Sequence, residues 1–166
     1  MKVWCELPKD REREGRLWVT GEDDARLFGP VLCRGEADNA NAAKSNNVVE
    51  DPTRVGGDHP FGVCRISECV EIRPSAKEFR TYGPWFLRLN PVSGEAWAAR
   101  QAGRTGIGIH GGAPGPNNSL RATYGCLRLD DESVESIAIL IQQETALGRQ
   151  VFYECIEEGT PCPSRP

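Results

Sequence analysis

The residues of this chain best suited to chemistry are a histidine and a cysteine, His110 and Cys126. A cysteine attacks an amide only as its thiolate, so it needs a nearby base to take its proton. His110 ends an apolar run and is followed by Gly111 and Gly112, while Cys126 follows Gly125 at a predicted tight turn. The Gly-, Pro- and Asn-rich segment between them reads as a loop long enough for the side chains to meet. The pattern therefore predicts Cys126 as a nucleophile and His110 as its base.

Neighbours of Cys126 supply the other groups that acyl transfer needs. The tetrahedral intermediate carries an oxyanion, which backbone N–H groups can stabilise. The amides of Tyr124, Gly125 and Cys126 are the predicted donors, because glycine permits the turn that this requires. Arg128 follows two positions later, so on a strand it points to the same side as Cys126 and could pair with a substrate carboxylate.

These residues also have ordinary structural interpretations. A cysteine between glycine and leucine is commonly a buried core thiol, and a strand arginine is commonly part of a surface ion pair. His59 could suggest a zinc site with Cys64 and Cys69. Structural zinc sites, however, use two pairs of closely spaced ligands, and a second pair downstream is missing. We therefore expect catalysis at Cys126, with no metal and no other cofactor.

Short strands joined by turns are the elements expected to position this pair. The 18 glycines and 12 prolines favour a mainly β fold, packed as a sandwich or barrel in a single domain over residues 1–166. One clear helix is predicted after the cysteine turn, with Asp130 or Asp131 as N-cap and Gly148 at its C-terminal cap. Residues 35–60 read as a long surface loop. The expected strands cover residues 2–7, 16–21, 61–73, 85–90, 106–109 and 149–155.

Composition argues against several functional classes. The net charge is -4 and the basic residues are scattered, so nucleic acid is not an expected partner. No segment has the length of a membrane span, and residues 1–19 lack the apolar core of a secretory signal peptide.

The segments IHGG (109–112) and TYGCLR (123–128) resemble the catalytic pattern of the L,D-transpeptidase (YkuD) family, H-x-x followed by [S/T]-x-G-C-[aliphatic]-[R/N]. The resemblance implies that Cys126 forms a thioester with a peptidoglycan stem peptide. It implies that His110 is the general base and that the backbone carbonyl of Gly111 holds the imidazole.

The same resemblance implies a set of substrate contacts. Thr123 occupies the position where members usually have serine, and Tyr124 stands where many have histidine. Together with Gly112 and Arg128, these two residues are the implied substrate-binding groups. The family fold is a β-sandwich or barrel with a short helix after the catalytic turn.

Two upstream segments extend the resemblance over roughly residues 55–155. GGDHPFGVCRI (56–66) is similar to a strand opening T-P-x-G-x-[aromatic], with His59 in place of threonine. TYGPWFLRLNP (81–91) is similar to the strand that crosses the substrate groove. The segments GPWFLRLNP (83–91), GRTGIGIHGG (103–112) and TYGCL (123–127) also resemble small type VI secretion L,D-transpeptidase effectors. Those effectors show GP-x-x-L-x-P, G-R-x-G-[I/F]-x-I-H-G and S-x-G-C-I in the same order. That role implies a cognate immunity protein, a secretion apparatus and action in the bacterial periplasm or cell envelope.

Several alternatives are weighed beside this one. A papain-like or cell-wall amidase cysteine hydrolase would place its cysteine before its histidine, whereas His110 precedes Cys126. A housekeeping crosslinking enzyme, or a catalytically silent peptidoglycan-binding module of the same fold, would share the pattern. The sequence leaves open whether the acyl group passes to water, to a crosslink or to a D-amino acid.

The cysteine count bears on the compartment. If Cys126 stays free, six cysteines remain, and we expect at least one disulfide among them. Cys155 and Cys162 could meet across a turn, whereas extended chain would hold Cys64 and Cys69 too far apart to pair.

Overall fold

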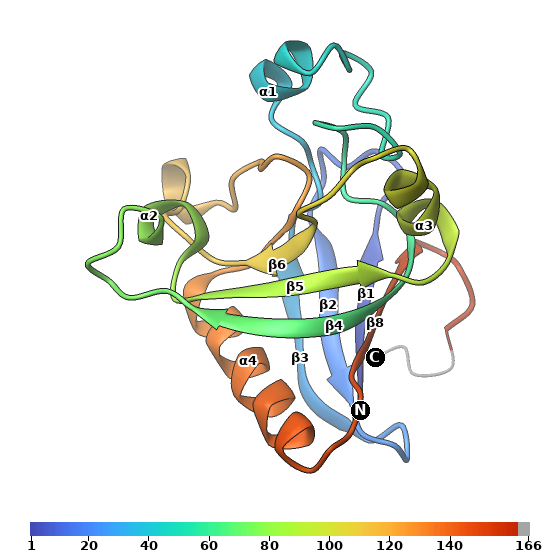
Figure 1. The fold of residues 1–166 in the computed structure, drawn as a ribbon, viewed down its shortest axis with the longest axis vertical. Coiled ribbons are helices and arrows are strands. Elements are labelled where there is room, and N and C mark those ends of the chain that lie inside the picture. The colour runs from blue at the N-terminus through green and yellow to red at the C-terminus, as the bar shows by residue number, and fades with distance from the viewer. Residues whose placement is uncertain (163–166) are drawn as a thin grey trace.

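The computed structural model describes residues 1–162, which form one eight-stranded mixed sheet that curls into a barrel-like shape (Figure 1). The strand order is β3-β2-β1-β8-β4-β5-β6-β7. Bridges from Arg34 to Arg128 and from Ala37 to Thr123 join the two edges, so the barrel is nearly closed. The strands are β1 (Lys2–Leu7), β2 (Gly15–Thr20), β3 (Arg26–Cys33), β4 (Gly62–Glu71), β5 (Trp85–Pro91), β6 (Gly108–His110), β7 (Leu127–Arg128) and β8 (Phe152–Glu157).

Apolar residues from the strands fill the barrel. Strand β1 pairs antiparallel with β2 and parallel with β8, and Val3, Leu17 and Tyr153 are fully buried between them. On the other half, β5 contributes Leu87 and β6 contributes Ile109. Strands β5 and β8 bury alternate residues, whereas β1 and β2 are buried over consecutive residues, 3–5 and 17–20. The eight-stranded, nearly closed sheet confirms the predicted mainly β, barrel-like architecture.

The predicted helix after the cysteine turn is α4 (Asp131–Ala146), which packs along the sheet (Figure 1). The Asp130 carboxylate accepts from the backbone N–H of Ser133, as an N-cap does. The buried face carries Val134, Ile137, Ala138 and Ile141. Gly148, with φ 75°, follows the helix in the left-handed conformation expected at its C-terminal end.

The prediction of only one clear helix was wrong. Within the described residues there are also α1 (Asn39–Lys44), α2 (Phe79–Tyr82), α3 (Gly94–Gln101) and a 3₁₀ turn at Pro116–Asn118. Helix α1 lies inside the segment predicted as a loop, where Asp38 caps it by accepting from Asn41. Helix α3 buries only two alanines and leaves Trp97 exposed, so it has no apolar stripe for the sequence to reveal.

Strand β3 was also missed, because its sequence contains Gly29-Pro30, a pair typical of turns. The strand tolerates this proline since it lies at one end of the strand order, where a missing N–H interrupts no second ladder.

The predicted disulfide is not present, because all seven cysteines are free thiols. Strand alternation turns Cys155 into the core, where it lies in register with Cys5, whereas Cys162 lies beyond the end of β8. The Cys5 and Cys33 sulfurs lie 3.7 Å apart as hydrogen-bonded thiols. The last residues of the tail, 163–166, lie outside the described residues.

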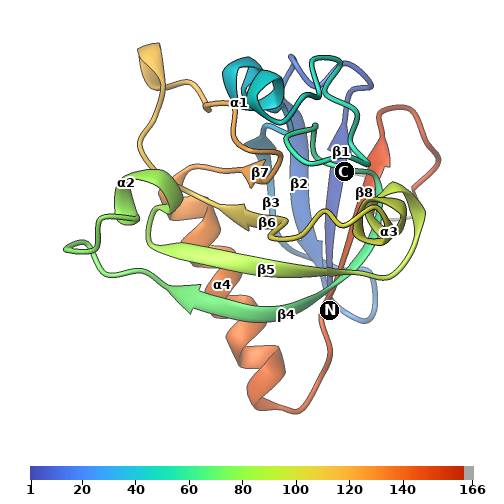
Figure 2. The same cartoon turned by 45° about the horizontal axis from the view of Figure 1, so that its top comes forward.

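The loop from β6 to β7 lies between α1 and α2 in both views (Figures 1 and 2). Among residues 1–162, no helix has the length and apolar character that crossing a membrane would take.

Candidate active site

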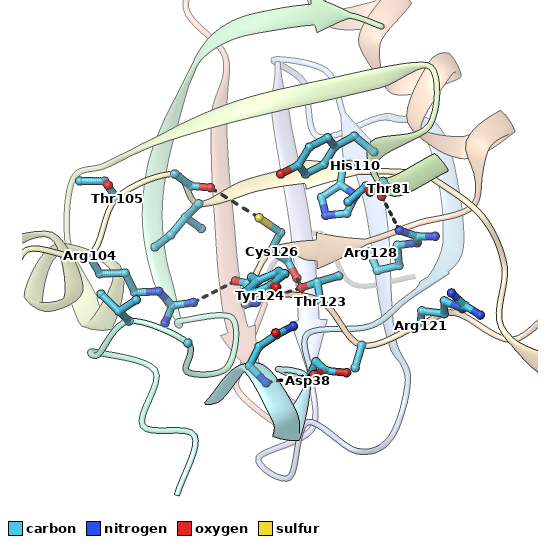
Figure 3. Close-up of a pocket in the computed structure, with 18 of the residues that line it drawn as sticks. Asp38, Thr81, Arg104, Thr105, His110, Arg121, Thr123, Tyr124, Cys126 and Arg128 are labelled. Carbon is cyan, nitrogen blue, oxygen red and sulfur yellow. Dashed lines mark hydrogen bonds between the residues drawn. The ribbon is translucent and has the colours of Figure 1, made fainter. Parts of the chain in front are cut away.

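A pocket of about 390 Å³ lies beneath the β6–β7 loop and contains both predicted catalytic residues. His110 is the last residue of β6, and Cys126 immediately precedes β7. The two strands are parallel neighbours, with Ile109 opposite Leu127, and this pairing brings the histidine and the cysteine to one site (Figure 3). Residues from α1, α2 and the segments before β6 and β7 complete the wall.

The Cys126 thiol is buried, with a relative exposure of 7%. Its sulfur donates to the Gly106 carbonyl at 3.5 Å. Burial raises the pKa of Cys126 above its usual value, while a hydrogen bond from the Gly108 backbone and the positive charge of Arg104 act in the opposite direction. The resting group at neutral pH is therefore the thiol, with a cation nearby to favour its ionised form.

The His110 imidazole is oriented by its own neighbour, because Nδ1 lies 2.7 Å from the Gly111 carbonyl oxygen. A carbonyl can only accept, so Nδ1 carries the proton and Nε2 keeps its lone pair. Tyr82 packs edge-on at 5.0 Å between ring centroids, and Phe86 stacks at 5.9 Å. Burial lowers the pKa of His110 to about 4. At neutral pH the ring is uncharged and able to take a proton.

The resting site is thus a neutral thiol beside a neutral imidazole. Among the described residues, the hydrogen bond of the Cys126 thiol goes to Gly106 and not to His110. Proton transfer therefore requires the thiol to turn toward Nε2, a rearrangement typical of catalytic groups in an empty site.

The predicted oxyanion hole needs one correction, at Gly125. Its backbone N–H donates to Thr123 Oγ1 at 3.0 Å, and that hydroxyl donates to the Cys126 carbonyl at 2.8 Å. Thr123 therefore holds the turn together, and the Gly125 amide is already occupied. The amides of Cys126 and Tyr124 make no backbone hydrogen bond to another described residue, which leaves these two of the three predicted donors.

Two of the predicted substrate-binding residues, Arg128 and Gly112, make hydrogen bonds to other parts of the chain. The Arg128 guanidinium donates to the carbonyls of Thr81 at 2.9 Å and Ala113 at 2.6 Å, and the residue is buried. Arg128 does line the pocket, but these contacts tie α2 and the β6–β7 loop to β7. Gly112 donates its N–H to the Asp131 carboxylate and does not line the pocket. Its φ of 116° makes it a turn residue.

Tyr124 and Thr123 do line the pocket as predicted, with Tyr124 66% exposed. Sequence reasoning missed Tyr82, Arg104 and Asp38, which line the same pocket from three separate segments. Arg104 belongs to the segment GRTG (103–106), and its burial, which singles it out, is visible only in the fold.

The buried His59 has no place in a metal site here. Its Nδ1 lies 3.2 Å from the Gly125 carbonyl, and its Nε2 lies 2.9 Å from the Tyr153 hydroxyl. Within residues 1–162, no group of three or more His, Cys, Asp or Glu side chains is placed to hold a metal ion.

Comparisons with known proteins support the fold alone. No family model and no curated protein matches this sequence. Among solved structures, the chain is similar to Bd1075 of Bdellovibrio bacteriovorus, with a TM-score of 0.55 and 15% sequence identity over 93% of this chain and 47% of that one. The chain thus spans about half the length of Bd1075. The likeness agrees with a mainly β, barrel-like architecture.

Proposed function

We propose that this protein is a cysteine acyltransferase of the L,D-transpeptidase type that acts on peptidoglycan stem peptides. The observation that carries the proposal is the state of His110. Its Nδ1–H is fixed on the Gly111 carbonyl, its Nε2 has no hydrogen bond to another residue in the described part of the chain, and it shares a pocket with the Cys126 thiol. A neutral imidazole with one free nitrogen is what a general base for a thiol must be. The order of the two residues along the chain supports the same family.

The charge of the pocket suits such a substrate. Arg80 and Arg121 are exposed and line the pocket. Figure 3 shows Arg121 on the same side as Arg128, and Asp38 on the wall at the start of α1. Stem peptides carry free carboxylates and, in many bacteria, a side-chain amine. We propose that the arginines receive a carboxylate and that Asp38 receives the amine.

The proposed reaction has two halves. His110 Nε2 takes the proton from Cys126 Sγ, the sulfur attacks the peptide carbonyl carbon, and the Cys126 amide stabilises the resulting oxyanion. The C–N bond then breaks, His110 returns its proton to the leaving amine, and a thioester remains. Water or an acceptor amine, deprotonated by His110, next attacks the thioester, and the Cys126 thiol is restored as the product leaves. Hydrolysis gives a carboxypeptidase, whereas an amine gives a crosslink or a D-amino acid exchange.

The test is mass spectrometry of muropeptides after incubation with peptidoglycan rich in tetrapeptide stems. Cys126→Ala should abolish product formation, and His110→Gln should lower the rate by several orders of magnitude, since the base and the later acid are both lost. Cys69→Ala is the matched control, because Cys69 is also a free thiol but lies outside the pocket. A carbapenem should add once, at Cys126. Full product formation by folded Cys126→Ala would refute the proposal.

We propose the bacterial periplasm or cell envelope as the site of action, because stem peptides are found there. The order of the segments at 83–91, 103–112 and 123–127 favours a type VI secretion effector, delivered by the type VI apparatus and neutralised by an immunity protein. Growth arrest should then follow when the chain is directed to a bacterial periplasm, and Cys126→Ala should prevent it. Additional crosslinks without arrest would instead identify a housekeeping enzyme.

A further inference from the structure

Arg104 is a buried cation whose guanidinium joins two separate segments of the chain. It is 4% exposed and lies in the segment between α3 and β6. Nη1 donates to the carbonyls of Pro52 and Asp58, and Nη2 donates to those of Gly57 at 2.8 Å and Gly125 at 3.0 Å. The four N–H groups of its planar fork therefore fasten the 52–58 loop to the turn that carries the nucleophile.

A second buried group reaches the same carbonyl. His59 Nδ1 lies 3.2 Å from the Gly125 oxygen, and because that oxygen can only accept, Nδ1 carries the proton. The Tyr153 hydroxyl is then the donor to Nε2 at 2.9 Å. Burial lowers the pKa of His59 to about 3, so this tautomer stays neutral across the physiological range. The Gly125 carbonyl thus accepts two buried hydrogen bonds from two different segments.

The direction of this carbonyl fixes the direction of the next amide. In a trans peptide the C=O and the following N–H lie in one plane and point in opposite directions within it. Because Arg104 and His59 both bind the Gly125 oxygen, they fix the orientation of this peptide plane and with it the direction of the Cys126 N–H. That amide makes no backbone hydrogen bond to another described residue, so it is free for a developing oxyanion.

We propose that Arg104 is a positioning residue for acyl transfer at Cys126, acting with His59 through the Gly125 carbonyl to aim the Cys126 amide at the oxyanion. The inference rests on the proposed role of Cys126 as nucleophile, but not on peptidoglycan as the substrate. The ionisable side chains that interact with the thiol charge are Arg104 and Tyr82, and His110 lines the same pocket. The Arg104 charge favours the thiolate that must form.

The experiment compares two reactions of the same sulfur. Acylation of Cys126 by p-nitrophenyl acetate passes through an oxyanion, whereas alkylation by iodoacetamide does not. Each rate constant is measured by mass spectrometry of the Cys126 peptide over a range of pH. Their ratio reports the oxyanion donor, and a change in thiol ionisation alone leaves that ratio nearly constant.

Arg104→Lys keeps the charge and loses the four-donor fork, so we expect the ratio to fall by about 100-fold, the loss seen when one oxyanion donor is removed. Arg11→Lys is the matched control, because Arg11 is also buried and donates to the carbonyls of Pro8, Lys9 and His59. It should leave the ratio unchanged. An unchanged ratio in folded Arg104→Lys, or an equal fall in Arg11→Lys, would overturn the proposal.

If Arg104→Lys fails to fold, the double variant His59→Phe/Tyr153→Phe decides. It removes one hydrogen-bond donor to the Gly125 carbonyl and leaves no tyrosine hydroxyl without its partner. The ratio of the acylation and alkylation rate constants should fall by about tenfold, which corresponds to the free energy of one hydrogen bond. No fall in that variant would refute the role of the Gly125 carbonyl. Failure of the parent protein to process peptidoglycan, with ester acylation intact, would remove only the substrate class.

Discussion

Replacing Tyr82 with alanine is expected to raise the pH below which Cys126 loses its reactivity. The Tyr82 ring meets the His110 imidazole edge-on at 5.0 Å, and with Phe86 it covers that ring. Burial is the main cause that lowers the pKa of His110 from 6.5 to about 4. A general base works only in its neutral form, so the acid limb of the pH–rate profile should report this pKa.

The magnitude follows from the two pKa values. With a pKa of about 4, roughly nine-tenths of His110 is neutral at pH 5, whereas with the ordinary 6.5 only about 3% would be. Complete loss of burial would therefore cost about 30-fold in rate at pH 5. Tyr82 is one of two covering rings, so we expect the acid limb to rise by about one pH unit.

The assay is the rate constant for acylation of Cys126 by p-nitrophenyl acetate between pH 3.5 and 8. Because thiol and imidazole titrate as a pair, the limb is compared between variants and not assigned to one residue. Trp97→Ala is the control, since Trp97 is an aromatic residue of α3 outside the pocket. An acid limb near pH 6.5 in the parent, or an unmoved limb in Tyr82→Ala, would refute the argument that burial sets this pKa.

Two further predictions concern the turn and the cysteines. Gly125→Ala should cut ester acylation by at least about 100-fold and destabilise the fold by several kcal/mol in urea unfolding, because a Cβ there would strike the Arg104 guanidinium and the Gly57 carbonyl at φ 94°. Gly148→Ala, also at positive φ but with open space around it, should cost only about 1 kcal/mol, and an equal loss in both would contradict the clash. A chromogenic disulfide reagent should count seven thiols in the denatured, unreduced protein, and a count of five would mean that one pair had oxidised.

The sequence was informative where the relevant physics is local. Helix α4 has a capping aspartate, helical spacing of apolar residues and a terminal glycine, all within 19 residues of one another, 130–148. That His110 and Cys126 share a site could likewise be predicted, because the glycines beside each residue and the loop between them all lie within residues 110–126. Helix α3 was missed because its contacts are made by two alanines, which carry no periodic signal.

The sequence was least informative about polar side chains with distant partners. The direction of Arg128 could be inferred from strand alternation, but its carbonyl partners come from α2 and the β6–β7 loop, so its contacts could not. Arg104 contacts carbonyls at residues 52, 57, 58 and 125, and His59 contacts residues 125 and 153. Such contacts exist only after the barrel has closed. The disulfide was predicted from an even count of cysteines, whereas strand alternation decides which thiols face one another.

The two pKa shifts at the site imply that ionisation and attack are coupled. Burial raises the pKa of Cys126 and lowers that of His110, so moving a proton from sulfur to imidazole in the empty pocket is unfavourable in both steps. A preformed ion pair would leave a reactive thiolate exposed to any oxidant or alkylating agent. In the proposed reaction the negative charge passes on to a carbonyl oxygen, which the Cys126 amide is proposed to stabilise, while the Arg104 charge assists ionisation of the thiol. On the proposed mechanism, the Arg104 contact with the Gly125 carbonyl and the neutral His110 would together favour attack of the thiol on an acyl group over its ionisation in the empty pocket.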